Sequence, residues 1–133
     1  MQTKKLIAAL KLPTILNIPP KLFPLIFDFN KYSLFLIEGG RGSAKTHSVG
    51  RFILYLGEQR KIKVCCGRVI KDSVKHSVLA LFKDLIDEFK LDYDVSENQI
   101  VHRKTGSVIF FKGFREQEIV NIKGLEGVDI LWI

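Results

Sequence analysis

Apolar residues along this chain form short continuous runs and longer segments with helical spacing. The runs at residues 34–38, 63–69 and 128–133 are typical of buried parallel strands, which are apolar on both faces. Residues 46–59 and 72–89 carry apolar side chains three and four positions apart, which predicts two amphipathic helices. Because strand and helix alternate at this spacing, the sequence predicts βαβ units and an α/β fold, with a mostly parallel sheet flanked by helices.

Each predicted helix has one apolar face. In the first helix that face consists of Val49, Phe52, Ile53 and Leu56. The second helix is longer, is capped by Asp72 or Ser73, and has an apolar face made of Val74, Val78, Leu81, Leu85 and Phe89.

A β-hairpin is predicted as an insertion after the second helix. Residues 99–103 and 107–112 are strand-like and flank the turn sequence Lys104-Thr105-Gly106. A turn of this length containing glycine is typical of two antiparallel strands joined directly.

The regions outside these elements are predicted to be short or irregular. Residues 3–11 have the pattern of a short helix, and all four prolines of the chain follow soon after it. A second short helix is expected at residues 116–122. We therefore divide the chain into an N-terminal lead-in, residues 1–30, and an α/β domain, residues 31–133.

Composition narrows the function classes only slightly. The 133 residues suffice for one domain with a hydrophobic core. With 47% hydrophobic and 26% charged residues, the chain is not of the disordered class. The net charge of +7 favours polyanionic partners such as nucleic acid, and an ordinary basic surface explains it equally well. Several basic residues are candidates for a DNA-facing surface, although their order in the sequence does not show that they share one face. They are Lys61, Lys63, Lys71, Lys75, Arg103, Lys104, Lys112 and Lys123.

The cysteines and the apolar runs indicate a cytoplasmic protein. Cys65 and Cys66 are neighbours in a predicted strand, so their side chains point to opposite faces and suit neither a disulfide framework nor a metal cage. No apolar stretch approaches the roughly 20 residues that a membrane span requires. Lys11 and Pro13 interrupt the weak signal-like pattern near the N-terminus.

A glycine-rich segment lies between the first predicted strand and the first predicted helix. It consists of Gly39, Gly40, Arg41, Gly42, Ser43, Ala44, Lys45 and Thr46. Strand, glycine-rich turn and helix N-terminus are the order of a phosphate-binding loop, whose backbone N–H groups surround an anion with help from the helix dipole. Lys45 is placed to reach the outer phosphates, and the Thr46 hydroxyl to hold Mg²⁺. The segment therefore predicts a nucleoside triphosphate site.

One loop position departs from the pattern G-x-x-x-x-G-K-[ST], which has glycine where this chain has Ala44. If the backbone there requires a positive φ, alanine costs about 1–2 kcal/mol. If the loop requires only a small side chain, a methyl group fits. A glycine-rich turn followed by a chance lysine is the alternative interpretation.

Four segments in order resemble the N-terminal ATPase part of a phage terminase large subunit, over roughly residues 34–133. They are GGRGSAKT at the loop, DSVKHSV in the second helix, GSVIFFKGF in the hairpin and IKGLEGVDILWI at the end. The resemblance implies a P-loop NTPase-like fold that binds ATP and Mg²⁺, in a motor that hydrolyses ATP to drive double-stranded DNA into a procapsid. It also implies a terminase small subunit and a portal protein as partners, a homo-oligomeric ring of the full-length protein, and the cytoplasm of a bacterial host without membrane attachment.

The resemblance also assigns roles to single residues. Lys45 would contact the phosphates, Thr46 would bind Mg²⁺, and Arg41 would sense or stabilise the γ-phosphate, since a guanidinium donates two hydrogen bonds to phosphoryl oxygens. Lys45 and Arg41 are thus the candidate catalytic residues. Arg68 is a further candidate for ligand contact on the basis of its position alone, because open α/β sheets place ligand contacts at the carboxyl ends of their strands. For Arg41 and Arg68, a solvated side chain is the alternative.

The final apolar run resembles the strand that leads into a Walker B motif, after which similar proteins have two acidic residues. Those residues hold Mg²⁺ and position the attacking water, and they are not among the 133 residues. Asp129 lies at the opposite end of the predicted strand, about 13 Å or more from the catalytic end. We expect its side chain to face solvent there. We therefore expect an incomplete ATPase domain that binds nucleotide and hydrolyses it poorly, and leave open whether the chain itself is an enzyme.

Two other functions fit the same sequence. One is another P-loop NTPase that acts on DNA, such as a helicase or a repair ATPase. The other is a nonenzymatic DNA-binding or assembly module with a decayed loop, which Ala44 and the lack of the acidic pair favour.

Overall fold

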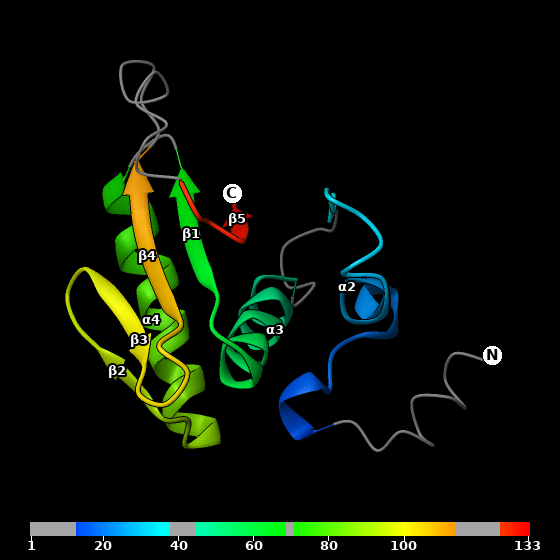
Figure 1. Ribbon diagram of the computed structural model, residues 1–133, viewed down its shortest axis with the longest axis horizontal. Helices are drawn as coiled ribbons and strands as arrows, with labels where there is room; N and C mark the ends of the chain where they lie inside the picture. The colour runs from blue at the N-terminus through cyan, green and yellow to red at the C-terminus, as the bar shows by residue number, and fades with distance from the viewer. Residues whose placement is uncertain (1–12, 38–44, 69–70, 114–125) are drawn as a thin grey trace. The chain divides into compact units, whose positions relative to one another are not determined.

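A five-stranded mixed sheet forms the framework of residues Leu56–Ile133 in the computed structural model (Figure 1). Its strand order is β2-β3-β4-β1-β5. The strands span Lys63–Arg68 (β1), Tyr93–Val95 (β2), Gln99–His102 (β3), Val108–Gly113 (β4) and Ile130–Trp132 (β5). The predicted α/β class is confirmed.

The structure describes residues 13–37, 45–68, 71–113 and 126–133. The chain divides into two units, Met1–Tyr55 and Leu56–Ile133, and each is described by itself. The helices predicted at residues 3–11 and 116–122 lie outside the described residues.

The parallel part of the sheet follows from the apolar runs. β1 pairs in parallel with β4 on one side and β5 on the other. Val64, Cys65 and Cys66 on β1 are fully or almost fully buried, as a strand with neighbours on both sides requires. The predicted strands at residues 63–69 and 128–133 are therefore confirmed, and both cysteines are free thiols of the core.

The predicted hairpin is confirmed as β3 and β4, which pair antiparallel across the turn at residues 103–107. The sheet is mixed rather than mostly parallel, because β3 also pairs antiparallel with β2, so the hairpin joins the main sheet instead of projecting from it. β2 was not predicted, since its three residues are too few to show an alternating pattern.

Helix α4, Lys71–Phe89, packs against β4 and β1 (Figure 1). Its apolar face is the predicted one in Val78, Leu81 and Leu85, which are buried. Phe82 is fully buried, and its ring lies 6.5 Å from that of Phe111 and 6.0 Å from that of Trp132. This cluster joins the helix to β4 and β5.

The start of α4 differs slightly from the prediction. The helix begins at Lys71, so Asp72 and Ser73 belong to its first turn and do not precede it as caps. Carboxylate and hydroxyl side chains are also favourable in a first turn, which explains why the sequence signal lay one to two residues too late.

The unit Met1–Tyr55 contains short helical turns and the greater part of one long helix. Turns η1 and η2 span Thr14–Leu16 and Pro20–Leu22, and helix α2 spans Phe23–Phe27. Prolines stand in the first turns of these helices, where a backbone N–H would have no helical acceptor. Because proline is tolerated there but not inside a helix, the helices of this region are short. Helix α3, Lys45–Gln59, agrees with the prediction for residues 46–59 to within one residue.

The prediction of a strand at residues 34–38 is wrong for residues 34–37, which belong to no strand. Leu34 and Leu36 are 74% and 83% exposed, whereas Phe35 and Ile37 are partly buried. An apolar run becomes a buried strand only when a neighbour hydrogen-bonds to it, and none of the five strands pairs with this segment.

Candidate functional site

Helix α3 begins at Lys45, the penultimate residue of the predicted phosphate-binding loop. Lys45 is partly exposed, and Thr46 is exposed. The first turn of a helix has N–H groups without helical acceptors and a partial positive charge, so this position suits an anion. The other loop residues, which include Arg41 and Ala44, lie outside the described residues.

Aromatic packing fixes the segment that precedes the loop against α3. The ring centroids of Phe29 and Phe52 are 5.1 Å apart at an interplanar angle of 62°. Phe35 stacks on Phe29 with centroids 6.4 Å apart and meets the Tyr32 ring edge-on at 6.2 Å. Since Phe52 is a buried residue of α3, the chain on both sides of the loop belongs to one packed group.

The N-terminal lead-in also braces α3. Arg51 Nη1 donates a hydrogen bond of 3.0 Å to the carbonyl oxygen of Asn17, the residue after η1. Ile15 and Leu16 of η1 are buried, as are Ser48 and Val49 of α3. The lead-in is therefore part of the support for the helix that carries Lys45, a role that its irregular sequence did not reveal.

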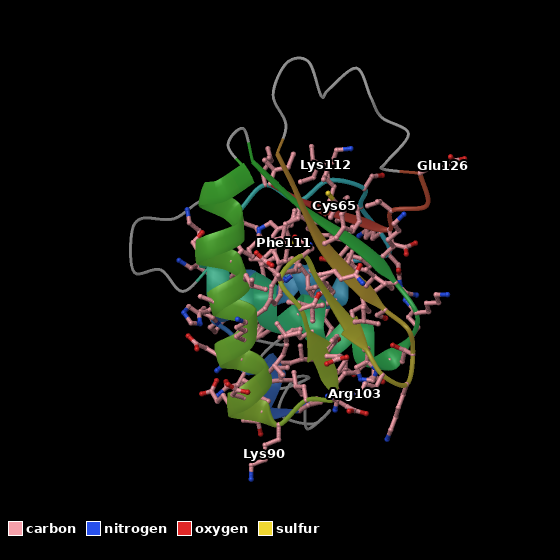
Figure 2. All side chains as sticks on the ribbon, turned by 90° about the vertical axis from the view of Figure 1, so that its left-hand side faces the viewer. Cys65, Lys90, Arg103, Phe111, Lys112 and Glu126 are labelled. Carbon is pink, nitrogen blue, oxygen red and sulfur yellow. The ribbon has the colours of Figure 1, made fainter. Side chains whose placement is uncertain are left out.

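The three parallel strands end at a common edge of the sheet. Arg68 is in register with Gly113 at the end of β4, and Cys66 is in register with Trp132 near the end of β5. Figure 2 labels Lys112 near the same edge. The backbone of Arg68 thus lies at the carboxyl edge, as predicted, while its side chain is outside the described residues.

Asp129 lies at the opposite end of β5, as predicted, but its carboxylate is bound to the backbone of β1. Asp129 Oδ2 accepts the Lys63 N–H at 2.8 Å, and the Asp129 N–H donates to the Lys63 carbonyl at 2.8 Å. Lys63 Nζ also donates to the carbonyl of Glu126 at 3.2 Å. The expectation of a merely solvent-facing aspartate is therefore corrected, because the residue is exposed and yet fixes the start of β5 against β1.

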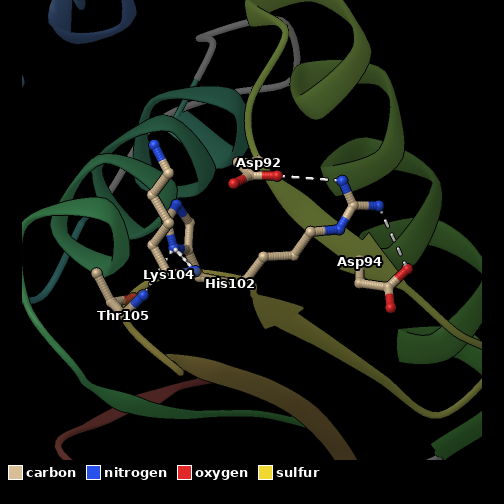
Figure 3. A network of polar contacts seen from close by, with 6 residues as sticks. Asp92, Asp94, His102, Lys104 and Thr105 are labelled. Carbon is tan, nitrogen blue, oxygen red and sulfur yellow. Dashed lines mark hydrogen bonds and ion pairs between the residues drawn. The ribbon is translucent and has the colours of Figure 1, made fainter.

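A buried polar cluster, Gly57, His102, Thr105 and Ser107, joins α3 to the β3–β4 turn. Thr105 Oγ1 donates to the Gly57 carbonyl at 2.6 Å, and Ser107 Oγ lies 2.8 Å from the same oxygen. His102 Nδ1 accepts the N–H groups of Lys104 and Thr105, at 3.2 and 3.1 Å (Figure 3). The contacts to Gly57 were missed because they join residues about 50 positions apart in sequence, and the local signal was the turn itself.

Two titratable groups next to this cluster have shifted pKa values. Burial raises the pKa of the Glu58 carboxyl; the imidazole of His102 acts in the opposite sense, and the carboxylate of Asp92 adds to the rise. Burial, and then the charge of Glu58, raise the pKa of the Tyr93 phenol well above its ordinary value. The phenol consequently stays protonated at neutral pH.

Burial also raises the pKa of both cysteine thiols. For Cys65 the ammonium groups of Lys112 and Lys63 oppose the rise, and for Cys66 the neighbouring Cys65 adds to it. A thiol must ionise to act as a nucleophile or a metal ligand, so these side chains suit neither role. Among the described residues, no three histidine, cysteine or acidic side chains are grouped so that they hold a metal ion.

A family model described as phage terminase large subunit matches residues 31–133 of the chain. A search of curated proteins finds no match. Within the described ranges, no helix has the length and apolar character needed to cross a membrane.

Proposed function

The chain belongs to the phage terminase large subunit family, and we propose that its residues 39–46 bind ATP together with Mg²⁺. The observation that carries this proposal is the start of α3 at Lys45, directly after the glycine-rich segment. A lysine and a threonine in the first turn of a helix are the arrangement that a phosphate-binding loop needs. The family match supports a P-loop NTPase-like fold as part of the same proposal.

The residues present fit the proposed ligand. Thr46 is exposed, so its hydroxyl is accessible to a hydrated cation, and Lys45 is partly exposed at the same helix end. The ammonium of Lys45 would hold the outer phosphates, and the guanidinium of Arg41 would contact the γ-phosphate. Mg²⁺, when bound, neutralises charge that develops on the phosphates.

Hydrolysis by the 133 residues alone is proposed to be weak. Phosphoryl transfer depends on a positioned water molecule, and a carboxylate near the γ-phosphate normally positions it. Among the described residues, the carboxylate closest to β5 in sequence is Asp129, which lies at the start of the strand and is engaged by the backbone of Lys63. It is therefore unavailable for that task.

The wider function follows from the family. We propose that the full terminase large subunit hydrolyses ATP to move double-stranded DNA into a procapsid in the cytoplasm of a bacterial host. A small terminase subunit, a portal protein and further copies of the large subunit in a ring are its proposed partners. The present residues would supply nucleotide binding to that motor.

Calorimetric titration of the 133-residue chain with Mg-ATP tests the nucleotide site. We expect micromolar binding that is lost in Lys45→Ala and weakened in Thr46→Ala. The matched control is Lys83→Ala, which removes an exposed lysine from α4 and is expected to bind ATP normally. ATP turnover at about 1–100 s⁻¹, the range typical of kinases, would contradict the proposal of weak hydrolysis.

Two results would favour the alternatives. Binding of ATP that is unaffected by Lys45→Ala would remove the loop from the site. Salt-sensitive DNA binding by a chain that binds no nucleotide would favour a nonenzymatic module with a decayed loop.

A further inference from the structure

Four cationic residues lie at the amino-terminal end of the parallel strands. Arg60 and Lys61 directly precede β1, whereas Arg103 and Lys104 lie in the turn between β3 and β4. All four residues are exposed. Figure 2 labels Arg103 at the end of the sheet opposite to Lys112, so the group lies away from the carboxyl edge of the sheet. The sequence did not reveal this grouping, because the two segments are far apart along the chain.

Hydrogen bonds hold the two cationic segments together. Ser107 Oγ lies 2.8 Å from the Arg60 carbonyl oxygen and accepts the Ile62 N–H at 3.0 Å. The side chain of Lys61 lies across Gly106, where a Cβ would stand 3.8 Å from its Cε atom. The spacing of the cations is thus set by a buried network, and a ligand need not order the backbone in order to bind.

One of the four cations is compensated by carboxylates. Arg103 Nη1 lies 3.1 Å from Asp92 Oδ1, and Arg103 Nη2 lies 3.7 Å from Asp94 Oδ1. In Figure 3, dashed lines mark these contacts at the carboxylates of Asp92 and Asp94, and no dashed line joins Lys104 to either carboxylate. Arg103 therefore contributes little free positive charge.

The other three cations are not paired with carboxylates of the described residues. In the part of the chain that the structure describes, no carboxylate lies within ion-pair distance of Arg60, Lys61 or Lys104. Two further acids lie in this region: Glu58, which interacts with His102 and Asp92, and Asp129, whose carboxylate accepts the Lys63 N–H. We call Arg60, Lys61 and Lys104 the basic patch.

The surroundings of the basic patch distinguish between partners. Among the residues that the structure describes, the large apolar side chains that are exposed belong to residues 27–36 and 131–133, and none belongs to the two cationic segments. Protein interfaces have an apolar or aromatic centre, which this surface lacks. Phosphate backbones are held by separate lysine and arginine side chains without such a centre.

We propose that the basic patch binds the phosphate backbone of double-stranded DNA without reading its sequence. The proposal extends the proposed function, because it places a DNA contact of the packaging protein at the amino-terminal end of the sheet, on residues other than those of the nucleotide loop. The contact is electrostatic, so it weakens as salt rises.

Fluorescence anisotropy of a labelled DNA duplex, titrated with the 133-residue chain at several salt concentrations, tests the proposal. The variant Arg60→Gln/Lys61→Gln/Lys104→Gln is expected to lose about tenfold in affinity near physiological salt, and its salt slope is expected to fall by about 3. The charge-matched control is Lys21→Gln/Lys31→Gln/Lys83→Gln, which removes three exposed lysines elsewhere and is expected to bind nearly as well as the unaltered chain. Arg60→Lys/Lys61→Arg/Lys104→Arg keeps the charges and is expected to retain binding.

Two further measurements separate the causes of a failure. Circular dichroism checks that each variant is folded, and Mg-ATP titration of the patch variant is expected to be unchanged, which keeps this test apart from that of the nucleotide site. Equal loss of DNA affinity in patch and control variants would overturn the proposal, because it would show dependence on net charge alone. Retained DNA binding with lost binding of polyglutamate would also overturn it, in favour of an acidic protein partner.

Discussion

The phenol oxygen of Tyr93 lies too close to Gly57 for a Cβ atom to be accommodated at position 57. Gly57 is buried in the last turns of α3, and Tyr93 is buried on β2. A side chain at position 57 would also meet Ser107 Cβ at 3.4 Å. The glycine is therefore required by the close approach of the edge strand to the helix, although glycine is unfavourable inside a helix.

Gly57→Ala is expected to destabilise the chain by about 1–3 kcal/mol, because overlap with the Tyr93 hydroxyl outweighs the better helix propensity of alanine. Chemical unfolding followed by the fluorescence of Trp132, the one tryptophan of the chain, measures the free energy. In the Tyr93→Phe background the hydroxyl is gone, and the cost of Gly57→Ala is expected to fall by at least about 1 kcal/mol. An unchanged cost in that background would show that the hydroxyl is not the obstacle.

Ser107→Ala is expected to cost about 2–3 kcal/mol of stability. Ser107 is 1% exposed, and its hydroxyl satisfies the Ile62 N–H and contacts the carbonyls of Gly57 and Arg60. Removal of the oxygen leaves a buried N–H without a partner. Ser96→Ala is the matched control, since Ser96 is exposed and bonds only locally to Gln99; it is expected to cost less than about 1 kcal/mol. Similar losses for both variants would contradict the structural role of Ser107.

Asp129→Ala is expected to loosen the start of β5 without unfolding the sheet. The carboxylate accepts the Lys63 N–H, so its loss is expected to cost about 1 kcal/mol and to speed hydrogen exchange at the amides of residues 63 and 129. Glu126→Ala is the control, because Glu126 contacts Lys63 through its backbone carbonyl, which the substitution keeps. Unaltered exchange in Asp129→Ala would exclude the carboxylate as an anchor of β5.

The elements that the sequence predicted are those whose segments carry a recognisable pattern, which is a helical or strand period or, for β5, a continuous apolar run. Helices α3 and α4, strand β1 and the β3–β4 hairpin each carry a pattern that their own residues complete. The segment at residues 34–37 has the same apolar character as β1 and is not a strand, because β1 has two hydrogen-bonded neighbours and this segment has none among the five strands. A neighbour of that kind is not visible in local sequence.

In the candidate site, too, the sequence predicted local features and not contacts between distant residues. The loop pattern predicted a helix start next to Lys45, and α3 begins there. The bond from Lys63 to Asp129 depends on the register of β1 with β5, and the gathering of Lys61 and Lys104 depends on a network that closes around Ser107. Both join residues more than 40 positions apart, so no local pattern contains them.

Glu58→Gln is expected to raise stability at neutral pH and to leave it unchanged in acid. Burial is the main reason why the pKa of Glu58 is raised above 4.5 in the folded chain, so the folded state holds the proton more tightly than the unfolded state. For such a group the favourable contribution is complete below the unfolded pKa and is lost as pH rises through the folded pKa. Glutamine keeps the neutral form at every pH, so the unfolding free energy of the variant should exceed that of the unaltered chain at pH 7, and the two should converge near pH 4.

Urea unfolding at a series of pH values measures the difference, with Glu126→Gln as an exposed control. A constant difference across the whole range would mean that glutamine acts through packing and that ionisation of Glu58 costs the fold nothing.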